Sequence, residues 1–158
     1  IARRLLAALG YAHSRGVVHA AALPDHVLVH PTEHTALLVD WCYSVRVGEP
    51  ARAAVGGAAA WYPPELLSKR PLGPQADIYL AGRCFAHLLG WSETLNYNGA
   101  VHFVPREIRA FVASCLIGNP ARRPTDALAL HDELGDVMQK LVGPPKFRLL
   151  AMPAASTT

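Results

Sequence analysis

The stretch LGYAHSRGVVHAAALPDHVL, residues 9–28, decides the fold of this chain. Its first residues complete an apolar pattern over residues 1–15, in which leucines recur at helical spacing. Gly16 follows, at the place where a helix ends well on a residue in the left-handed conformation. His19 then opens a run of alanines, and residues 27–29 form an apolar triplet rich in valine. The stretch therefore predicts a helix, a loop and a short strand.

The residues after this stretch predict a small hairpin and then a loop. The apolar runs 27–29 and 36–39 flank the polar turn 30–34, which is the pattern of two short antiparallel strands. Residues 45–60 are rich in glycine and alanine and have no apolar periodicity. Such a composition is typical of a loop.

The remainder of the chain has a helical pattern. Helices are predicted over residues 64–67, 77–89 and 105–116, followed by a last helix that opens at Pro124-Thr125-Asp126. The second of these is apolar nearly all round, so we expect it to lie buried at the centre of the fold. Thr125 is placed to cap the last helix, while Asp126 suits its positive end. The chain is thus predicted to be mainly α, with one or two small β-hairpins.

Length and composition limit the domain organisation and the partners. The chain has 158 residues and a mass of 17.0 kDa, which is the size of one domain. With 51% hydrophobic and 17% charged residues, disorder is excluded, and no apolar run reaches the ~18 residues of a membrane span. The net charge of +3 comes from scattered basic residues, so neither nucleic acid nor a membrane is expected as a partner. We expect one domain over residues 1–142 and an extended tail or linker over residues 143–158.

The cysteines indicate a reducing compartment. Cys42, Cys84 and Cys115 are odd in number and widely spaced, which fits neither a disulfide framework nor a zinc motif. A cytoplasmic or intracellular location is therefore expected. The first residue is Ile1 rather than Met, and we interpret this start as a cut in a longer chain.

Taken together, the motifs resemble those of the C-lobe of eukaryotic-type protein kinases. Residues 9–19 are similar to the helix before the catalytic loop of that family, and residues 19–28 lie over its H-R-D-L-K-P-E-N-V-L loop. The later motifs of the family follow in order, with D-F-G at residues 40–42, A-P-E at 63–65, D-V-W-S-L-G at 77–82 and D-P-x-x-R-P-T at 119–125. The resemblance covers residues 1–140 and implies a helical C-lobe, without the Gly-rich loop and the lysine of the N-lobe.

The positions that would carry phosphoryl transfer hold other residues. The resemblance places Ala21 at the catalytic base, Leu23 at the cation beside the transferred phosphate and His26 at the metal-binding asparagine. A methyl group accepts no proton, and imidazole is a poor ligand for Mg²⁺. Asp40 alone keeps its carboxylate, as a weak contact to a nucleotide. We therefore expect no metal and no cofactor, with Mg-ATP held weakly at best.

Structural residues that the resemblance assigns are present. His19 corresponds to the histidine beneath the catalytic loop, and Asp77 to the aspartate that accepts hydrogen bonds from the loop backbone. Glu65 and Arg123 correspond to a buried ion pair that ties the activation segment to the last helices. We therefore expect the frame of the lobe to persist, although the chemical groups are replaced.

This combination predicts a pseudokinase, which is not an enzyme but a protein-binding, regulatory or scaffold module. Its partner would be another protein or the remainder of the same polypeptide. Self-association is also expected, because an isolated C-lobe exposes apolar surface. Two alternatives stay open. The chain could belong to a nucleotide-binding sensor or weak kinase whose N-lobe lies outside it, or it could be a structural building block of a larger assembly.

Several side chains allow weaker interpretations. Asp40 also fits a loop or capping carboxylate that belongs to the fold alone. Asp25 lies four residues beyond the base position and could act as a displaced base. His26, His30 and His34 are close in sequence, but a strand and a turn need not bring them together as a zinc site.

Overall fold

The computed structural model describes residues 1–30, 32–33, 35–90 and 104–144, and it is mainly α, as predicted. The helices are α1 (Ala2–Ser14), α2 (Pro64–Leu67), α3 (Pro74–Leu88), α4 (Arg106–Cys115) and α5 (Ala127–Val142). Short 3-10 turns are η1 (Pro24–His26), η2 (Trp41–Tyr43), η3 (Ala59–Trp61) and η5 (Pro120–Arg122). No helix in these ranges is both long and apolar enough to cross a membrane. Most of the predicted tail, residues 145–158, lies outside the described residues.

The short strands β1 (Val17–Val18), β2 (Val27–His30), β3 (Thr35–Leu38) and β4 (Val45–Arg46) form two small sheets. β2 and β3 pair antiparallel, with Val27 opposite Leu38, which confirms the predicted hairpin. β1 pairs antiparallel with β4, although β4 lies in a region predicted as loop. The described residues therefore form one hairpin and one long-range strand pair, and the loop from His19 to Leu23 follows β1 and leads toward the hairpin.

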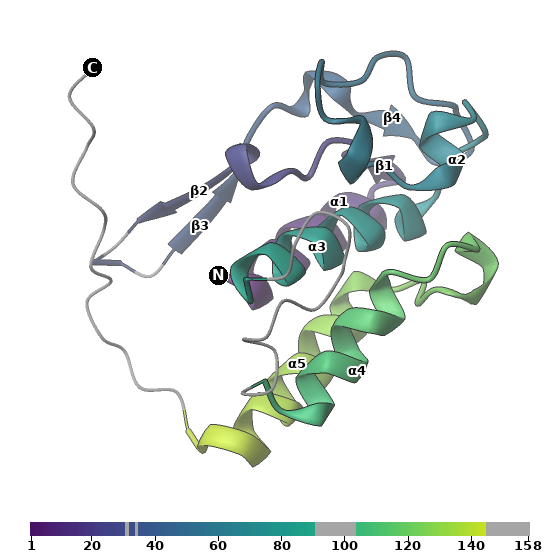
Figure 1. Cartoon of the computed structure of the whole chain (residues 1–158). Helices are drawn as coiled ribbons and strands as arrows, with labels where there is room; N and C mark the ends of the chain where they lie inside the picture. The colour runs from purple at the N-terminus through teal and green to yellow at the C-terminus, as the bar shows by residue number, and fades with distance from the viewer. Residues whose placement is uncertain (31, 34, 91–103, 145–158) are drawn as a thin grey trace.

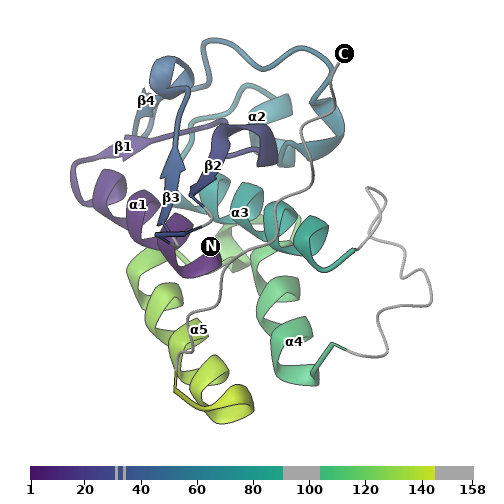
Figure 2. The same ribbon diagram turned by 90° about the vertical axis from the view of Figure 1, so that its left-hand side faces the viewer.

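The helices form the core below these strands. Both views place α4 and α5 together on one side of α1 and α3, with the strands on the other side (Figure 1, Figure 2). The fully buried side chains of this core include Leu6, Leu9, Ile78 and Leu80. Gly82 permits the close approach of α3 to α4, because a Cβ there would lie 2.6 Å from the Cβ of Cys115.

Two helix starts differ from the prediction. α3 begins at Pro74 rather than Asp77, because proline at the first helical position has a suitable φ and forfeits no hydrogen bond. The cap of α5 is Asp126, whose carboxylate accepts from two N–H groups of the first turn at 2.8 Å and 3.3 Å. The prediction of Thr125 as the cap is therefore wrong.

Candidate functional site

Asp77, in the first turn of α3, holds the loop between β1 and β2. Its side chain is fully buried, and its carboxylate accepts hydrogen bonds from the backbone N–H groups of His19 at 2.7 Å and Ala20 at 2.8 Å. His13 in α1 adds a third contact, from Nε2 to Oδ2 of Asp77 at 2.9 Å. One buried carboxylate thus joins two helices to the loop, and hydrogen bonds to a charged acceptor of this kind are strong.

The backbone of the loop bends sharply at Ala20. This residue has a φ of 63°, in the left-handed region that a side chain with a Cβ rarely adopts. Such a conformation costs about 1–2 kcal/mol and persists where the surrounding contacts determine it. Asp40 has the same φ of 63°, so strained backbone occurs on both sides of the candidate site.

His19 lies beneath the loop and carries no positive charge. Its side chain is fully buried, its Nε2 donates to the carbonyl oxygen of Val39 at 2.9 Å, and its Nδ1 accepts from the N–H of Ala21 at 3.2 Å. Burial lowers the pKa of His19 below its usual 6.5, and the nearby Asp77 carboxylate only partly opposes this shift. The indole of Trp41 stands edge-on against the imidazole, with ring centroids 4.6 Å apart.

The tip of the loop presents only hydrocarbon side chains. Ala20, Ala21 and Ala22 are each at most 1% exposed, and Leu23 is 5% exposed. The positions that the resemblance assigns to the base and to the cation therefore hold buried groups without polar atoms. The carbonyl oxygen of Ala22 accepts from the thiol of Cys84 at 3.2 Å, and burial raises the pKa of that thiol to about 12.

His26 and Asp40 come together at the outer edge of the loop. Nε2 of His26 lies 3.1 Å from Oδ2 of Asp40, and Nδ1 lies 2.7 Å from the carbonyl oxygen of Ala21. The imidazole is buried and lies nearly parallel to the ring of Tyr43, with centroids 6.1 Å apart and planes within 14°. The carboxylate of Asp40 is about half exposed. The sequence places both residues near the site but gives no sign that they contact each other.

These side chains do not fit the Mg²⁺ ion that the kinase resemblance implies. Mg²⁺ takes oxygen ligands in nearly octahedral geometry, and one oxygen of Asp40 already faces His26. Nδ1 of His26 faces the carbonyl oxygen of Ala21, and an imidazole nitrogen is in any case a poor ligand for Mg²⁺, which prefers oxygen. Within the part of the chain that the structure describes, no group of three or more His, Cys, Asp or Glu side chains could hold a metal ion.

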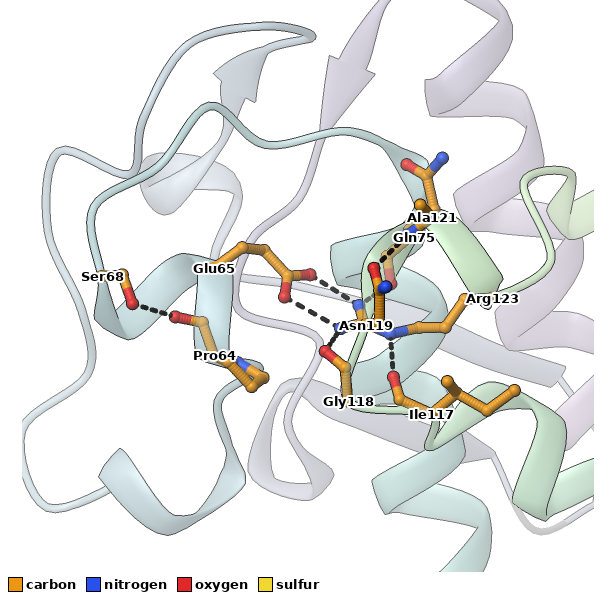
Figure 3. Close-up of polar contacts among 9 residues, drawn as sticks. All are labelled: Pro64, Glu65, Ser68, Gln75, Ile117, Gly118, Asn119, Ala121 and Arg123. Atoms are coloured by element: carbon orange, nitrogen blue, oxygen red, sulfur yellow. Dashed lines mark hydrogen bonds and ion pairs between the residues drawn. The ribbon is translucent and has the colours of Figure 1, made fainter.

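A buried ion pair fixes the start of α2 to the rest of the lobe (Figure 3). Nη1 and Nη2 of Arg123 lie 2.5 Å and 2.8 Å from the two carboxylate oxygens of Glu65, and both residues are 3% exposed. The guanidinium also donates to the backbone carbonyl oxygens of Gln75, Ile117 and Gly118. The pair therefore joins α2, the start of α3 and the segment around η5 in one polar cluster.

His13 is a site residue that the sequence analysis did not predict. It lies in the last turn of α1, where its Nε2 contacts Asp77, and its buried Nδ1 has no hydrogen-bond partner among the residues that the structure describes. One feature of the sequence could have identified His13: it stands four residues after the buried Leu9, which places it on the core-facing side of the helix.

The residues considered as a displaced base or as zinc ligands lie away from the tip of the loop. Asp25 is exposed in η1, and His30 is exposed at the end of β2. The Nδ1 atom of His30 contacts the hydroxyl of Thr32 and the N–H of Glu33, both local neighbours. His34 lies outside the described residues. None of the described contacts brings Asp25 or His30 to Asp40.

The architecture as a whole is that of the C-lobe of protein kinases. A loop held by a buried aspartate and a segment fixed by a buried Glu–Arg pair occur in the order and places that the resemblance implies. Residues 1–135 match the protein kinase domain family, and the chain belongs to this family.

Several relatives are named serine/threonine-protein kinases. The chain is 26% identical over 166 residues to Serine/threonine-protein kinase PAK mbt of Drosophila melanogaster, an alignment that covers 92% of this chain and 25% of that protein. It is 26% identical over 161 residues to PAK 5 of Rattus norvegicus, covering 89% of this chain and 22% of that protein. It is 26% identical over 152 residues to Serine/threonine-protein kinase STE20 of Saccharomyces cerevisiae, covering 84% of this chain and 16% of that protein. The chain thus spans a quarter or less of the length of these curated relatives.

The prediction that the chain is not an enzyme is wrong. The chain belongs to the protein kinase domain family, and the relatives named above are serine/threonine-protein kinases, which points to an enzyme. The prediction failed because it inferred the class of the protein from the side chains of one loop.

Proposed function

We propose that this chain is part of a kinase-family domain that acts chiefly as a nucleotide-binding regulatory module and transfers phosphate slowly. The observation that carries the proposal is the buried run of alanines at the loop tip, with Ala21 at the base position and Leu23 at the cation position. The loop backbone keeps its two bonds to Asp77, while the side chains at its tip have no polar atoms. A loop with an intact backbone and no polar side chains at its tip favours nucleotide binding over fast phosphoryl transfer.

Slow transfer follows from the groups that are present. Phosphoryl transfer in kinases depends mainly on positioning and on electrostatic stabilisation, and a general base adds about 10²–10⁴-fold. Without a carboxylate at residue 21 or a cation at residue 23, we expect a rate below the typical ~1–100 s⁻¹ of kinases by at least that factor. In this proposal an N-lobe outside the chain supplies the lysine that binds the phosphates.

Asp40 supports the nucleotide part of the proposal. Its carboxylate is 52% exposed, and it is held by a backbone in the left-handed conformation rather than by the hydrophobic core. Strained backbone of this kind is concentrated at binding and catalytic sites. A nucleotide would therefore reach Asp40 without any rearrangement of the loop tip.

The hairpin β2–β3 supports the regulatory part of the proposal. Leu28 and Leu37 are opposite each other across the two strands and are 52% and 64% exposed. The other side of the hairpin packs against the core through Val27 and Leu38, so the leucine pair lies on its outer, accessible face. The partner in this proposal is a protein segment, or the remainder of the same polypeptide, that covers the pair. An intracellular location is part of the same proposal, because all three cysteines are free thiols.

Restoring the carboxylate tests the chemical part of the proposal. Transfer of the γ-phosphate of ATP to a serine-containing peptide library is measured for the wild type, for Ala21→Asp and for the matched control Ala22→Asp. We expect Ala21→Asp to raise the rate at least tenfold and Ala22→Asp to leave it unchanged, because only residue 21 stands at the base position.

Melting temperatures with and without ATP report folding and nucleotide binding for the same proteins. A wild-type rate typical of kinases would contradict the proposal. Equal rates for the wild type and a folded, ATP-binding Ala21→Asp variant would also contradict it.

A further inference from the structure

We propose that the groove between α1, α3, α4 and α5 binds helix α5 of a second copy of this chain, so that two copies pair through the same face. The described residues that line this groove include none from the loop between His19 and Leu23, none from the β2–β3 hairpin, and not Asp40. The inference therefore concerns a second surface and does not rest on the proposed function.

The groove is large and mostly apolar. It has a volume of about 940 Å³ and lies beside α4 and α5, on the helical side of the lobe (Figure 1). The buried side chains of Phe111 and Val112 in α4 contribute to its lining, together with Leu88 at the end of α3 and with Met138 and Val142 near the end of α5. The last three are 58%, 39% and 65% exposed. Large exposed apolar side chains around one concave surface are typical of a protein interface.

Two arginines border the groove at the start of α1. Among the described residues, the lining contains Arg3, Arg4 and His131 but no carboxylate, and neither arginine takes part in an ion pair. Both lie in the first turn of α1, which has no acidic residue. The N-terminus of a helix is its positive end, so cations are unfavourable there. A carboxylate from an occupant of the groove would offset this repulsion.

Arg3 lies against α5 of its own copy. A Cβ at Gly135 would stand 3.1 Å from Cζ of Arg3, so the guanidinium occupies the space that the glycine leaves on α5. Arg4 is exposed and is therefore the cation that is available to an occupant. The groove thus calls for a segment that carries a carboxylate close to apolar side chains.

Helix α5 of a second copy meets both requirements. Met138, Leu141 and Val142 are exposed in its last two turns, at 39%, 37% and 65%. Asp136 is exposed two residues before Met138, and among the described residues it forms no ion pair. We assign Asp136 as the partner of Arg4 in the other copy.

The match is reciprocal, because α5 both lines the groove and carries the side chains that would enter it. Each copy would give Asp136 to the other and receive it at Arg4, which closes the assembly at two copies around a twofold axis. Asp132 is less suited to this role, since its carboxylate already lies 2.9 Å from Nδ1 of His131.

Charge favours a second copy over the tail of the same chain. Residues 145–158 contain Lys146 and Arg148 but no aspartate or glutamate. These cations would meet Arg4 as like charges, which is unfavourable at an interface.

Sedimentation equilibrium of the full chain at several concentrations measures the pairing. We expect the mean mass to rise with concentration from the 17.0 kDa of one copy toward twice that value. A mass of 17.0 kDa at all concentrations up to about 100 µM would overturn the inference, because interfaces of ordinary size associate at micromolar concentration or below. A groove that is filled by the tail, or that serves a different protein, would give this result.

Met138→Glu tests whether the groove is the surface that pairs. It places a charge both in the apolar lining and on the helix that enters the other copy, so we expect the dissociation constant to rise at least tenfold. Leu67→Glu is the matched control, because Leu67 is 55% exposed in α2 and is not among the lining residues. It should pair like the wild type. A folded Met138→Glu variant that pairs as tightly as the wild type would overturn the inference, since the copies would then use another face.

Exchanging the two charges tests the assigned ion pair. Arg4→Asp and Asp136→Arg each place like charges opposite each other, and we expect each to raise the dissociation constant about fivefold or more. The double variant restores opposite charges and should pair within about threefold of the wild type. Both positions are exposed, so this test holds even if Met138→Glu does not fold; circular dichroism reports folding for every variant. A double variant that pairs no better than the weaker single variant would overturn the inference.

Discussion

Replacing Arg123 with alanine removes the cation of the buried pair with Glu65. The carboxylate that remains is 3% exposed and loses both of its bonds to the guanidinium. Breaking a buried pair by removing one partner costs about 3–5 kcal/mol, because the other charge stays buried without compensation. The carbonyl oxygens of Gln75, Ile117 and Gly118 lose a donor in the same step, which places Arg123→Ala toward the upper end of that range.

Glu65→Ala is the complementary change. It leaves the guanidinium with its three carbonyl acceptors and with the ring of Tyr79, whose centroid lies 4.9 Å from Cζ. We expect a loss of similar size, because the charge of arginine cannot be removed by deprotonation. Each single variant already breaks the pair, so the double variant should lose less stability than the sum of the two, by about 1–3 kcal/mol.

Urea denaturation and thermal melting of the three variants measure these losses. A loss of about 3–5 kcal/mol corresponds to a fall in Tm of about 6–20 °C for a protein of this size. The exposed pair of Glu49 and Arg52, with atoms 3.2 Å apart and side chains 42% and 79% exposed, is the matched control. Arg52→Ala should change stability by no more than about 0.5 kcal/mol. Small, additive effects of Arg123→Ala and Glu65→Ala would refute the reasoning, since they would mean that this pair behaves like a surface pair.

Two further predictions concern the frame around the loop. Burial lowers the pKa of His19 below its usual 6.5. Below pH 6.5 the unfolded chain therefore binds a proton at this histidine more readily than the folded chain does. The free energy of unfolding should accordingly fall as the pH decreases from about 6.5. As the pH decreases from about 6.5, the urea midpoint of His19→Asn should fall less steeply than that of the wild type. An equal dependence on pH in both proteins would contradict the lowered pKa of His19. Gly82→Ala places a Cβ 2.6 Å from the Cβ of Cys115 and should destabilise the fold by about 1–3 kcal/mol. Gly118→Ala, where a Cβ meets no atom within 4 Å, should change the melting temperature little, and an equal effect of both changes would argue against the packing of α3 on α4.

The helices and the hairpin could be predicted because their signals are local. Apolar residues recur at helical spacing in α1 and α4, and apolar runs flank a polar turn in β2–β3. The cap of α5 was misplaced because Thr125 and Asp126 both have an oxygen that can accept from the first turn. The pairing of β1 with β4 could not be predicted, since two-residue strands far apart in sequence have no periodicity to reveal them.

The contacts of the site depend on how distant segments meet, and the sequence reveals only some of them. The bonds from Asp77 to the loop agree with the expectation from the family resemblance. The contact between His26 and Asp40 could not be foreseen, because the resemblance relates both positions to a metal and not to each other. His13 was missed for a related reason. A histidine on a buried helix face is compatible with many partners, and only the packing of α1 against α3 selects Asp77.

Loop shape and loop chemistry have separate sources in this lobe. The left-handed bend at Ala20 is held by Asp77, which belongs to another helix, and by His19 below, whose Nδ1 accepts from the N–H of residue 21. None of these bonds uses a side-chain atom of residue 21. A carboxylate placed at residue 21 removes none of these anchoring bonds, but it introduces a charge at a position that is 0% exposed, whereas a change at Asp77 would alter the loop itself. The difference in rate between the wild type and Ala21→Asp therefore measures the contribution of the base only when the melting temperatures of the two proteins agree.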